Sequence, residues 1–130
     1  MGNILVVDDD PDIVTLLRCV LERDGHAVSS AANGQAALRA LGLDPADSAV
    51  KLPDLMILDI MMPVMDGFAL NSRLQDFPAA RSMPVIVLTA KGQKMRDLFQ
   101  GSPNVAAYVQ KPFDPKMLRD LIIGVLGRKK

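Results

Sequence analysis

At 130 residues, of which 49% are apolar, the chain has the size and composition of one domain with its own core. Fifteen Lys and Arg residues balance fifteen Asp and Glu residues, so no net positive charge attracts nucleic acid or anionic lipid. No apolar run approaches the roughly 18 residues that a membrane span requires, and the acidic start argues against a signal peptide. The single cysteine cannot form an internal disulfide. We therefore expect a cytoplasmic protein with no direct nucleic-acid or membrane partner.

Short runs of branched apolar residues predict strands that are buried on both faces, because the runs are nearly continuous instead of alternating. The four clear runs are Asn3 to Val7, Asp54 to Leu58, Pro84 to Thr89 and Val105 to Val109. A weaker run, Ala27 to Ala31, predicts a fifth strand.

Helical patterns lie between these runs. A helix is predicted from Pro11 to a stop at Gly25, a second opens at Asn33 and Gly34, and a third follows Gly67. Near the end, Asp114 and Pro115 form a typical helix start. Breakers at 101–104 predict a shortened helix before the last strand. Five strands alternating with five helices indicate an α/β fold with a doubly wound parallel sheet.

In such a fold, ligands bind where the carboxyl ends of the strands meet. The residues at these ends are Asp8, Asp9 and Asp10 after the first strand, Asp59 after the third, Thr89 after the fourth and Lys111 after the fifth. Clustered carboxylates repel one another unless a cation is present, and hard oxygen ligands without histidine or thiolate favour Mg²⁺. Lys111 is suited to contact a phosphoryl oxygen.

Four segments carry a family resemblance that covers nearly the whole chain: ILVVDDDPDI (4–13), LDIMMPVMDG (58–67), VLTA (87–90) and YVQKPF (108–113). In this order they resemble the receiver domain of two-component response regulators. The resemblance implies a flavodoxin-like, five-stranded sheet of order 2-1-3-4-5. It also implies a receiver domain over 1–127, with 128–130 as a tail or truncated linker.

The resemblance assigns a role to each residue at the strand ends. Asp59 would be the phosphoacceptor, taking a phosphoryl group from a sensor histidine kinase or a histidine phosphotransfer protein. Asp9, Asp59 and the backbone carbonyl of Met61 would hold Mg²⁺, and Asp8 would act through a bound water. Lys111, Thr89 and the Ala90 amide would contact phosphoryl oxygens. The chain is then a phosphoacceptor that catalyses its own phosphorylation and dephosphorylation, not an enzyme in the usual sense.

Further residues match regulatory positions of the family. Thr89 and Tyr108 resemble its switch pair, which would transmit phosphorylation to an output protein or domain that is not identified. Met61 and Lys91 stand at positions that tune dephosphorylation, and an apolar Met61 predicts a long-lived phosphoryl group. Pro112 resembles a proline that often follows a cis peptide bond.

Other residues receive structural interpretations. Asp10 is expected at the N-terminus of the first helix instead of on the metal. Gly67 is expected to supply backbone freedom at a helix start. His26 is expected at the surface, and Cys19 at the edge of the core. The segment Leu43 to Pro53 is longer than a receiver needs and could hold an extra helical turn or a loop.

Two other functions compete with phosphotransfer. A receiver-like module could bind partners without being phosphorylated. A haloacid-dehalogenase-like phosphohydrolase could use Asp8 and Asp10, with Thr89 and Lys111. That family's first motif has Thr or Val where this chain has Asp12, and no further strand after Lys111 carries acids for its metal.

Overall fold

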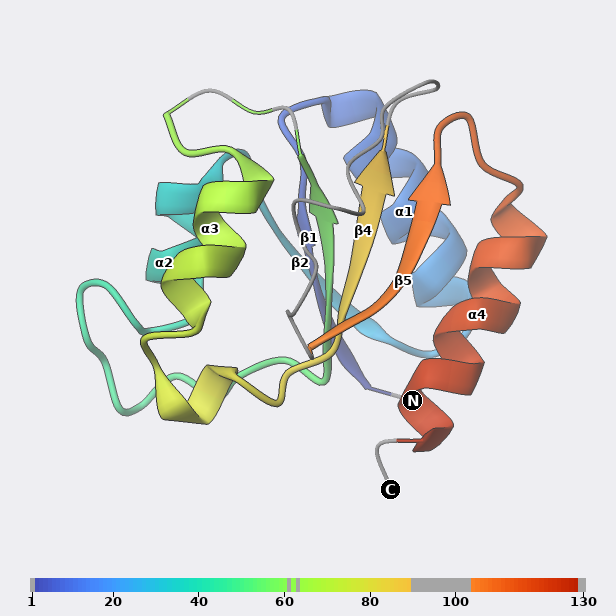
Figure 1. The fold of residues 1–130 in the computed structure, drawn as a ribbon. Coiled ribbons are helices and arrows are strands. Elements are labelled where there is room, and N and C mark those ends of the chain that lie inside the picture. The colour runs from blue at the N-terminus through green and yellow to red at the C-terminus, as the bar shows by residue number, and fades with distance from the viewer. Residues whose placement is uncertain (1, 61, 63, 90–103, 129–130) are drawn as a thin grey trace.

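The computed structural model describes residues 2–60, 62, 64–89 and 104–128, and it contains one five-stranded parallel sheet (Figure 1). The order of the strands is β2-β1-β3-β4-β5, which confirms the predicted doubly wound topology. The strands are β1 (Asn3–Val7), β2 (Ala27–Ala31), β3 (Leu55–Asp59), β4 (Val85–Thr89) and β5 (Val105–Gln110). The strand bounds predicted from the sequence differ from these by at most one residue at either end.

Helices cover both faces of the sheet: α2 and α3 lie on one side, α1 and α4 on the other (Figure 1). Their bounds are α1 (Pro11–Arg23), α2 (Gly34–Ala40), α3 (Gly67–Leu74) and α4 (Pro115–Arg128), with a short 3₁₀ helix η1 (Pro78–Ala80). The shortened helix predicted before β5 lies outside the described residues. None of the helices in the described part of the chain has the length and apolarity needed to cross a bilayer.

Each of three helices starts with a side-chain cap that satisfies a free backbone N–H of the first turn. Asp10 accepts a hydrogen bond from the amide of the second residue of α1, and Asn33 and Asp66 cap α2 and α3 in the same way. The predicted Asp114 accepts from the Lys116 amide at 2.9 Å where α4 begins. Local sequence thus determines where these helices begin.

The apolar residues form two clusters, one on each face of the sheet. The first, which we call the α2–α3 cluster, includes Leu38, Leu70 and Leu74 with alternate residues of the central strands. The second, the α1–α4 cluster, includes Leu17, Leu21 and Ile122 with the other alternate residues. Because the central strands are buried on both faces, their sequences show no polar alternation.

Two predictions of burial were wrong. His26 is only 7% exposed, because the turn at Gly25 (φ 87°) brings it beneath the amino ends of the strands. Its Nδ1 accepts a hydrogen bond from the Gly2 amide at 3.1 Å. Cys19 is exposed, since it lies two residues, or about 200°, around α1 from the buried Leu17.

The segment from Leu43 to Pro53 is a loop and contains no helical turn. It begins with an isolated antiparallel bridge between Leu43 and Ala46 that surrounds a cis Asp44–Pro45 peptide bond. Arg73 of α3 pairs with Asp44 at 3.2 Å and holds this loop against the helix. Of the two sequence interpretations, the loop is the correct one.

Candidate functional site

Polar side chains meet at the carboxyl edge of the sheet, where the topology places the ends of β1, β3, β4 and β5 together. Asp59 is the last residue of β3 and Thr89 is the last residue of β4, while Asp8 directly follows β1 and Lys111 directly follows β5. Their sequence positions span more than a hundred residues, but parallel pairing brings them to one place.

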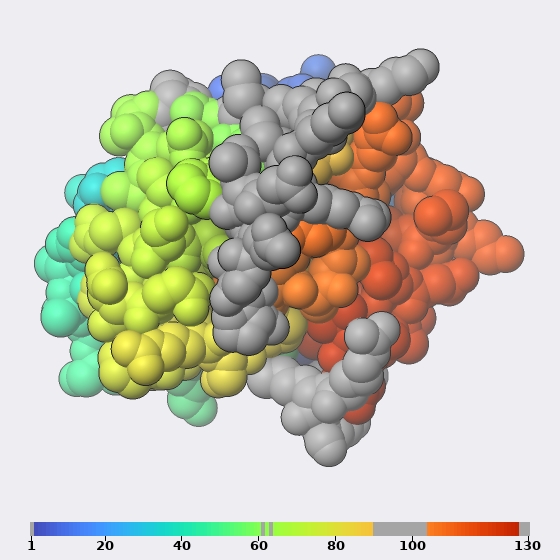
Figure 2. Space-filling view, viewed as in Figure 1, coloured from blue at the N-terminus to red at the C-terminus, as the bar shows by residue number. Residues whose placement is uncertain are grey.

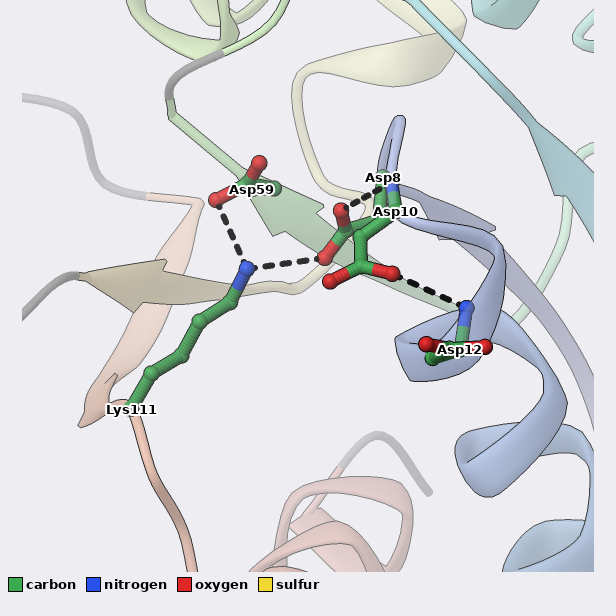
Figure 3. A network of polar contacts seen from close by, with 5 residues as sticks. All are labelled: Asp8, Asp10, Asp12, Asp59 and Lys111. Carbon is green, nitrogen blue, oxygen red and sulfur yellow. Dashed lines mark hydrogen bonds and ion pairs between the residues drawn. The ribbon is translucent and has the colours of Figure 1, made fainter.

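Lys111 connects the two buried carboxylates of the site (Figure 3). Its Nζ donates to Asp8 Oδ2 at 3.0 Å and to Asp59 Oδ1 at 3.2 Å. Its backbone N–H donates to the Thr89 carbonyl at 2.7 Å, which fixes the end of β5 against β4. The Lys111–Pro112 peptide bond is cis, as the resemblance predicted.

Asp8 is held more firmly than a loop residue usually is. Its Oδ1 accepts from the Asp10 amide at 2.9 Å, and its own amide donates to the Ala31 carbonyl at 3.0 Å. Asp10 directs its carboxylate to the Asp12 amide at 2.9 Å and lies off the Lys111 bridge (Figure 3). Asp10 therefore caps α1, as expected.

The acidic cluster has the composition and spacing of a site for a hard cation. Carboxylate oxygens of Asp8, Asp9 and Asp59 lie within 4.8 Å of one another. Asp8 is 2% exposed and Asp59 is 6% exposed, so water screens their repulsion poorly. Against these three carboxylates, Lys111 supplies one positive charge, so two negative charges have no ion-pair partner within the described part of the chain. These oxygen donors suit Mg²⁺, which takes one or two carboxylates and keeps several waters.

The electrostatics of Asp59 and Lys111 reflect this crowding. Burial, and then the charge of Asp8, raise the pKa of Asp59 despite the neighbouring ammonium. Burial acts to lower the pKa of Lys111, but its hydrogen bond to Asp8 and the charge of Asp59 outweigh it and raise the pKa. The ammonium is thus the strongly favoured form of Lys111. Ionisation of Asp59 costs more free energy than ionisation of an exposed aspartate does.

Of the remaining predicted site residues, the structure describes only Thr89 and Tyr108. Thr89 is buried beside the Lys111 backbone, and Tyr108 is half-buried against the α2–α3 cluster. Met61, Ala90 and Lys91 lie outside the described residues, so their expected roles remain predictions.

Gly67 proved important for a different reason from the one expected. A Cβ at this position would overlap the carbonyl oxygen of Asp59, and the Gly67 amide donates to the Ile60 carbonyl at 2.8 Å. The lack of a side chain therefore lets α3 begin directly against the end of β3. Sequence reasoning found the residue but assigned it backbone freedom, because a close approach between distant backbones leaves no local signal.

The strand order, the helical layers and the acidic edge are those of a receiver-type signalling domain. The family described as the response regulator receiver domain matches residues 4–123, and the chain belongs to this family. Receiver domains bind Mg²⁺ at an acidic pocket, and membership implies interaction with a histidine kinase or phosphotransfer partner.

Relatives and solved structures agree with this assignment. The chain is 39% identical over 120 residues to response regulator PleD of Caulobacter vibrioides. The matched region covers 90% of this chain and 24% of PleD. It is 38% identical to the DNA-binding regulator RpaA of Synechocystis, with 98% of this chain and 50% of that protein covered. A putative response regulator from Chloroflexus aurantiacus superposes with a TM-score of 0.84 at 30% identity, covering 97% of this chain and 98% of that one.

The chain thus spans a quarter to a half of these two curated relatives. RpaA is named as DNA-binding, so output domains of relatives can contact nucleic acid. The expectation that this chain has no direct nucleic-acid partner therefore remains a prediction.

Proposed function

We propose that this receiver domain is a phosphorylation-dependent switch in a two-component or phosphorelay system, and that Asp59 accepts the phosphoryl group. The observation that carries the proposal is the position of Lys111, whose ammonium contacts both Asp8 and Asp59 at the carboxyl edge of the sheet. The donor is the phosphohistidine of a sensor kinase or of a phosphotransfer protein.

The reaction is an in-line displacement at phosphorus. A carboxylate oxygen of Asp59 forms a bond to phosphorus, and the bond from phosphorus to the donor imidazole nitrogen breaks. The electron pair of the broken bond stays on that nitrogen, so a donor ring protonated at its other nitrogen leaves as neutral imidazole. Because the transferring group is loosely bonded in the transition state, positioning and neutralisation of charge supply most of the catalysis.

Asp8, Asp9 and Asp59 would hold Mg²⁺, together with the backbone carbonyl of Met61. When bound, the ion neutralises phosphoryl charge and orients the group for displacement. Lys111 neutralises a phosphoryl oxygen, and Thr89 and the Ala90 amide donate hydrogen bonds to others. The raised pKa of Lys111 keeps its ammonium charged throughout.

Transmission of phosphorylation to the output partner depends on Thr89 and Tyr108, which lie on the adjacent strands β4 and β5. Phosphorylation favours one of two pre-existing arrangements of this pair and alters a protein-binding surface. Met61 and Lys91 tune the lifetime of the phosphoryl group. We place the protein in the cytoplasm, without a direct membrane or nucleic-acid partner.

The competing functions fit the site less well. A module that only binds partners has no need of buried carboxylates with uncompensated charge, which cost stability. A phosphohydrolase based on Asp8 and Asp10 would need both carboxylates at the reaction centre, but Asp10 caps α1. Neither alternative uses the contact between Lys111 and Asp59.

Intact-mass analysis after incubation with acetyl phosphate tests the proposal. With Mg²⁺ we expect one added phosphoryl group, located on Asp59, which disappears in Asp59→Asn and in the presence of EDTA. Asp10→Asn is the matched control, because asparagine also caps helices and should leave phosphorylation intact. Folded wild-type protein that gains no phosphoryl group would support the binding module. Phosphate release that survives Asp59→Asn but stops in Asp8→Asn would support the phosphohydrolase.

A further inference from the structure

Two buried asparagines at the amino end of the sheet take no part in the proposed function. Asn71 of α3 is 2% exposed, and Asn104, directly before β5, is 5% exposed. Asn104 Nδ2 donates to Asn71 Oδ1 at 2.8 Å, and Gln75 Nε2 donates to Asn104 Oδ1 at 3.2 Å. Both ends of the Asn104 amide are therefore satisfied, although the residue is almost completely removed from water.

The backbone of Asn104 is held as firmly as its side chain. Its carbonyl accepts from the Val85 amide at 2.8 Å, at the point where β4 and β5 begin to pair. At the other end of β5, the Lys111 amide donates to the Thr89 carbonyl at 2.7 Å. The strand is thus fixed at its start by Asn104 and at its end by Lys111.

Between these fixed ends, β5 carries one residue more than its partner strand. Val85 pairs with Val105, but the next residue of β4, Ile86, pairs with Ala107. Ala106 is left as a bulge, and it is exposed. A bulge of this kind changes which face the following side chains occupy.

The bulge decides where Tyr108 points. Val105 and Tyr108 both pack against the α2–α3 cluster, although residues three apart in a regular strand lie on opposite faces. Ala107 and Val109 pack against the α1–α4 cluster. Only the extra residue at Ala106 allows Val105 and Tyr108 to share one face.

The side chains of β5 specify this register weakly. The strand is at the edge of the sheet, and its two consecutive alanines are interchangeable in size. In a regular ladder that keeps Tyr108 opposite Val87, Ala106 would pair with Val85. Ala106 would then replace Val105 beside Tyr108 in the α2–α3 cluster. The buried amides oppose this change, because moving Asn104 would leave polar atoms of both asparagines without partners.

We propose that the Asn71–Asn104 pair pins the bulged register of β5 and thereby positions Tyr108 against the α2–α3 cluster. Asn71 and Asn104 are positioning residues that act through Tyr108. A buried polar pair that selects one register at some cost in stability is a known physical device. The part of the proposal that concerns switching rests on the proposed function, whereas the part that concerns register does not.

The test compares Asn104→Leu, Asn71→Leu and the double variant with wild type. Each single variant leaves a buried amide without its partner, while the double variant replaces both by apolar groups of similar size and should recover stability. Leu38→Val is the matched control, because it removes a buried methylene from α2 without touching β5. Cross-strand nuclear Overhauser contacts report the register. Fluorescence reports Tyr108 alone, because the chain contains one tyrosine and no tryptophan.

In the double variant we expect the contact between Val85 and Val105 to be lost and a contact between Val85 and Ala106 to appear. Quenching of Tyr108 fluorescence by acrylamide should change, even where unfolding shows that stability has returned. Acetyl phosphate with Mg²⁺ should still phosphorylate Asp59, but the accompanying change in Tyr108 fluorescence should shrink. Leu38→Val should keep the wild-type register and the wild-type response.

A folded double variant that keeps the Val85–Val105 contact and the wild-type Tyr108 quenching would overturn the proposal. If a single variant fails to fold, the double variant still decides the question. Failure of the proposed function is distinguishable, because wild-type protein would then take up no phosphoryl group. The register is measured without a phosphodonor and so would still be decided.

Discussion

Buried polar side chains gather at both ends of the sheet, but the two sets differ in charge. At the carboxyl end, Asp8 and Asp59 are ionisable, share one lysine and have excess negative charge. At the amino end, Asn71 and Asn104 are neutral, one hydrogen bond joins them, and Gln75 donates to the Asn104 side-chain oxygen. Excess charge makes the first set responsive to a cation or a phosphoryl group. Neutral amides whose hydrogen bonds are satisfied within the protein make the second set a structural constraint.

Figure 2 shows one face of the molecule, viewed as in Figure 1. α3 occupies one side of the view and the β5–α4 region the other. Asn71 lies in α3 and Asn104 leads into β5, so their hydrogen bond links the two regions beneath the surface.

The largest effect is expected at Lys111. Lys111→Met leaves Asp8 and Asp59 buried without their shared cation and removes a donor to the phosphoryl group. We expect phosphorylation by acetyl phosphate to slow by about 100-fold, the usual effect of losing one charge-stabilising donor. Lys116→Met, at an exposed position of α4, is the matched control and should react at the wild-type rate. Equal rates in the two variants would remove Lys111 from the mechanism.

Met61 provides the next test of the carboxyl end. Met61→Asn should shorten the lifetime of the phosphoryl group several-fold, because an amide can orient an attacking water that an apolar side chain excludes. The decay of phosphorylated protein, followed by intact mass, measures this lifetime. Met117→Asn, a change at a residue of α4 that is 70% exposed, should leave it unaltered. Loss of phosphate no faster than in wild type would contradict the shielding role.

Val64 tests the loop that leads from the acidic site into α3. Its φ is 69°, which is unfavourable for a β-branched residue, and its side chain is 82% exposed. Hydrogen bonds from Gly34 to Met65 and from Gly67 to Ile60 hold the backbone on both sides. Val64→Asn should raise the free energy of unfolding by about 1 kcal/mol, because asparagine tolerates this conformation. Val64→Ala should gain less, and chemical denaturation that shows no gain for Val64→Asn would contradict the strain.

The pH dependence of the free energy of unfolding tests the role of His26 at the amino end of the sheet. Burial lowers the pKa of His26, while the charge of Asp24 opposes that shift. The neutral ring is needed because Nδ1 accepts from Gly2, and the buried Nε2 has no hydrogen-bond partner among the residues that the structure describes. The unfolded chain therefore binds the proton more tightly, so stability should fall as pH drops from about 6.5 through the folded-state pKa.

The matched variant is His26→Asn, whose Oδ1 can also accept from Gly2 but does not titrate. Its free energy of unfolding should show less pH dependence between about pH 7 and 5 than that of wild type. Asp24, paired with Arg119 at 2.7 Å, keeps its charge in this window because its pKa is lowered by that hydrogen bond. Identical pH profiles for the two proteins would show that His26 does not control this transition.

Local sequence was sufficient to predict those elements whose formation depends mainly on one kind of interaction. Strands β3 and β4 were recognised because burial on both faces requires continuous apolar residues. Asp10 and Asn33 were recognised as helix starts because capping acts within three residues. The carboxyl-edge site followed from topology, since Asp59 and Lys111 need only end parallel strands to meet.

Prediction failed where a residue's environment comes from distant segments. Nothing near His26 in the sequence indicates that Gly2 lies against its ring. Asn71 and Asn104 are separated by 33 positions, and each alone is typical of an exposed polar residue. The bulge at Ala106 was missed because two registers of an alanine pair look alike in sequence.

The element order, the two apolar faces and the chemical types gathered at the carboxyl edge could all be predicted from the amino-acid sequence. These follow from hydrophobic periodicity and strand topology, which are local or combinatorial properties of the chain. Three features are visible only in the folded molecule: the ammonium bridge from Lys111 to Asp8 and Asp59, the burial of His26 and the register of β5. Those features depend on distances between residues far apart in sequence, which the packing and the long-range hydrogen bonds of the folded chain set together.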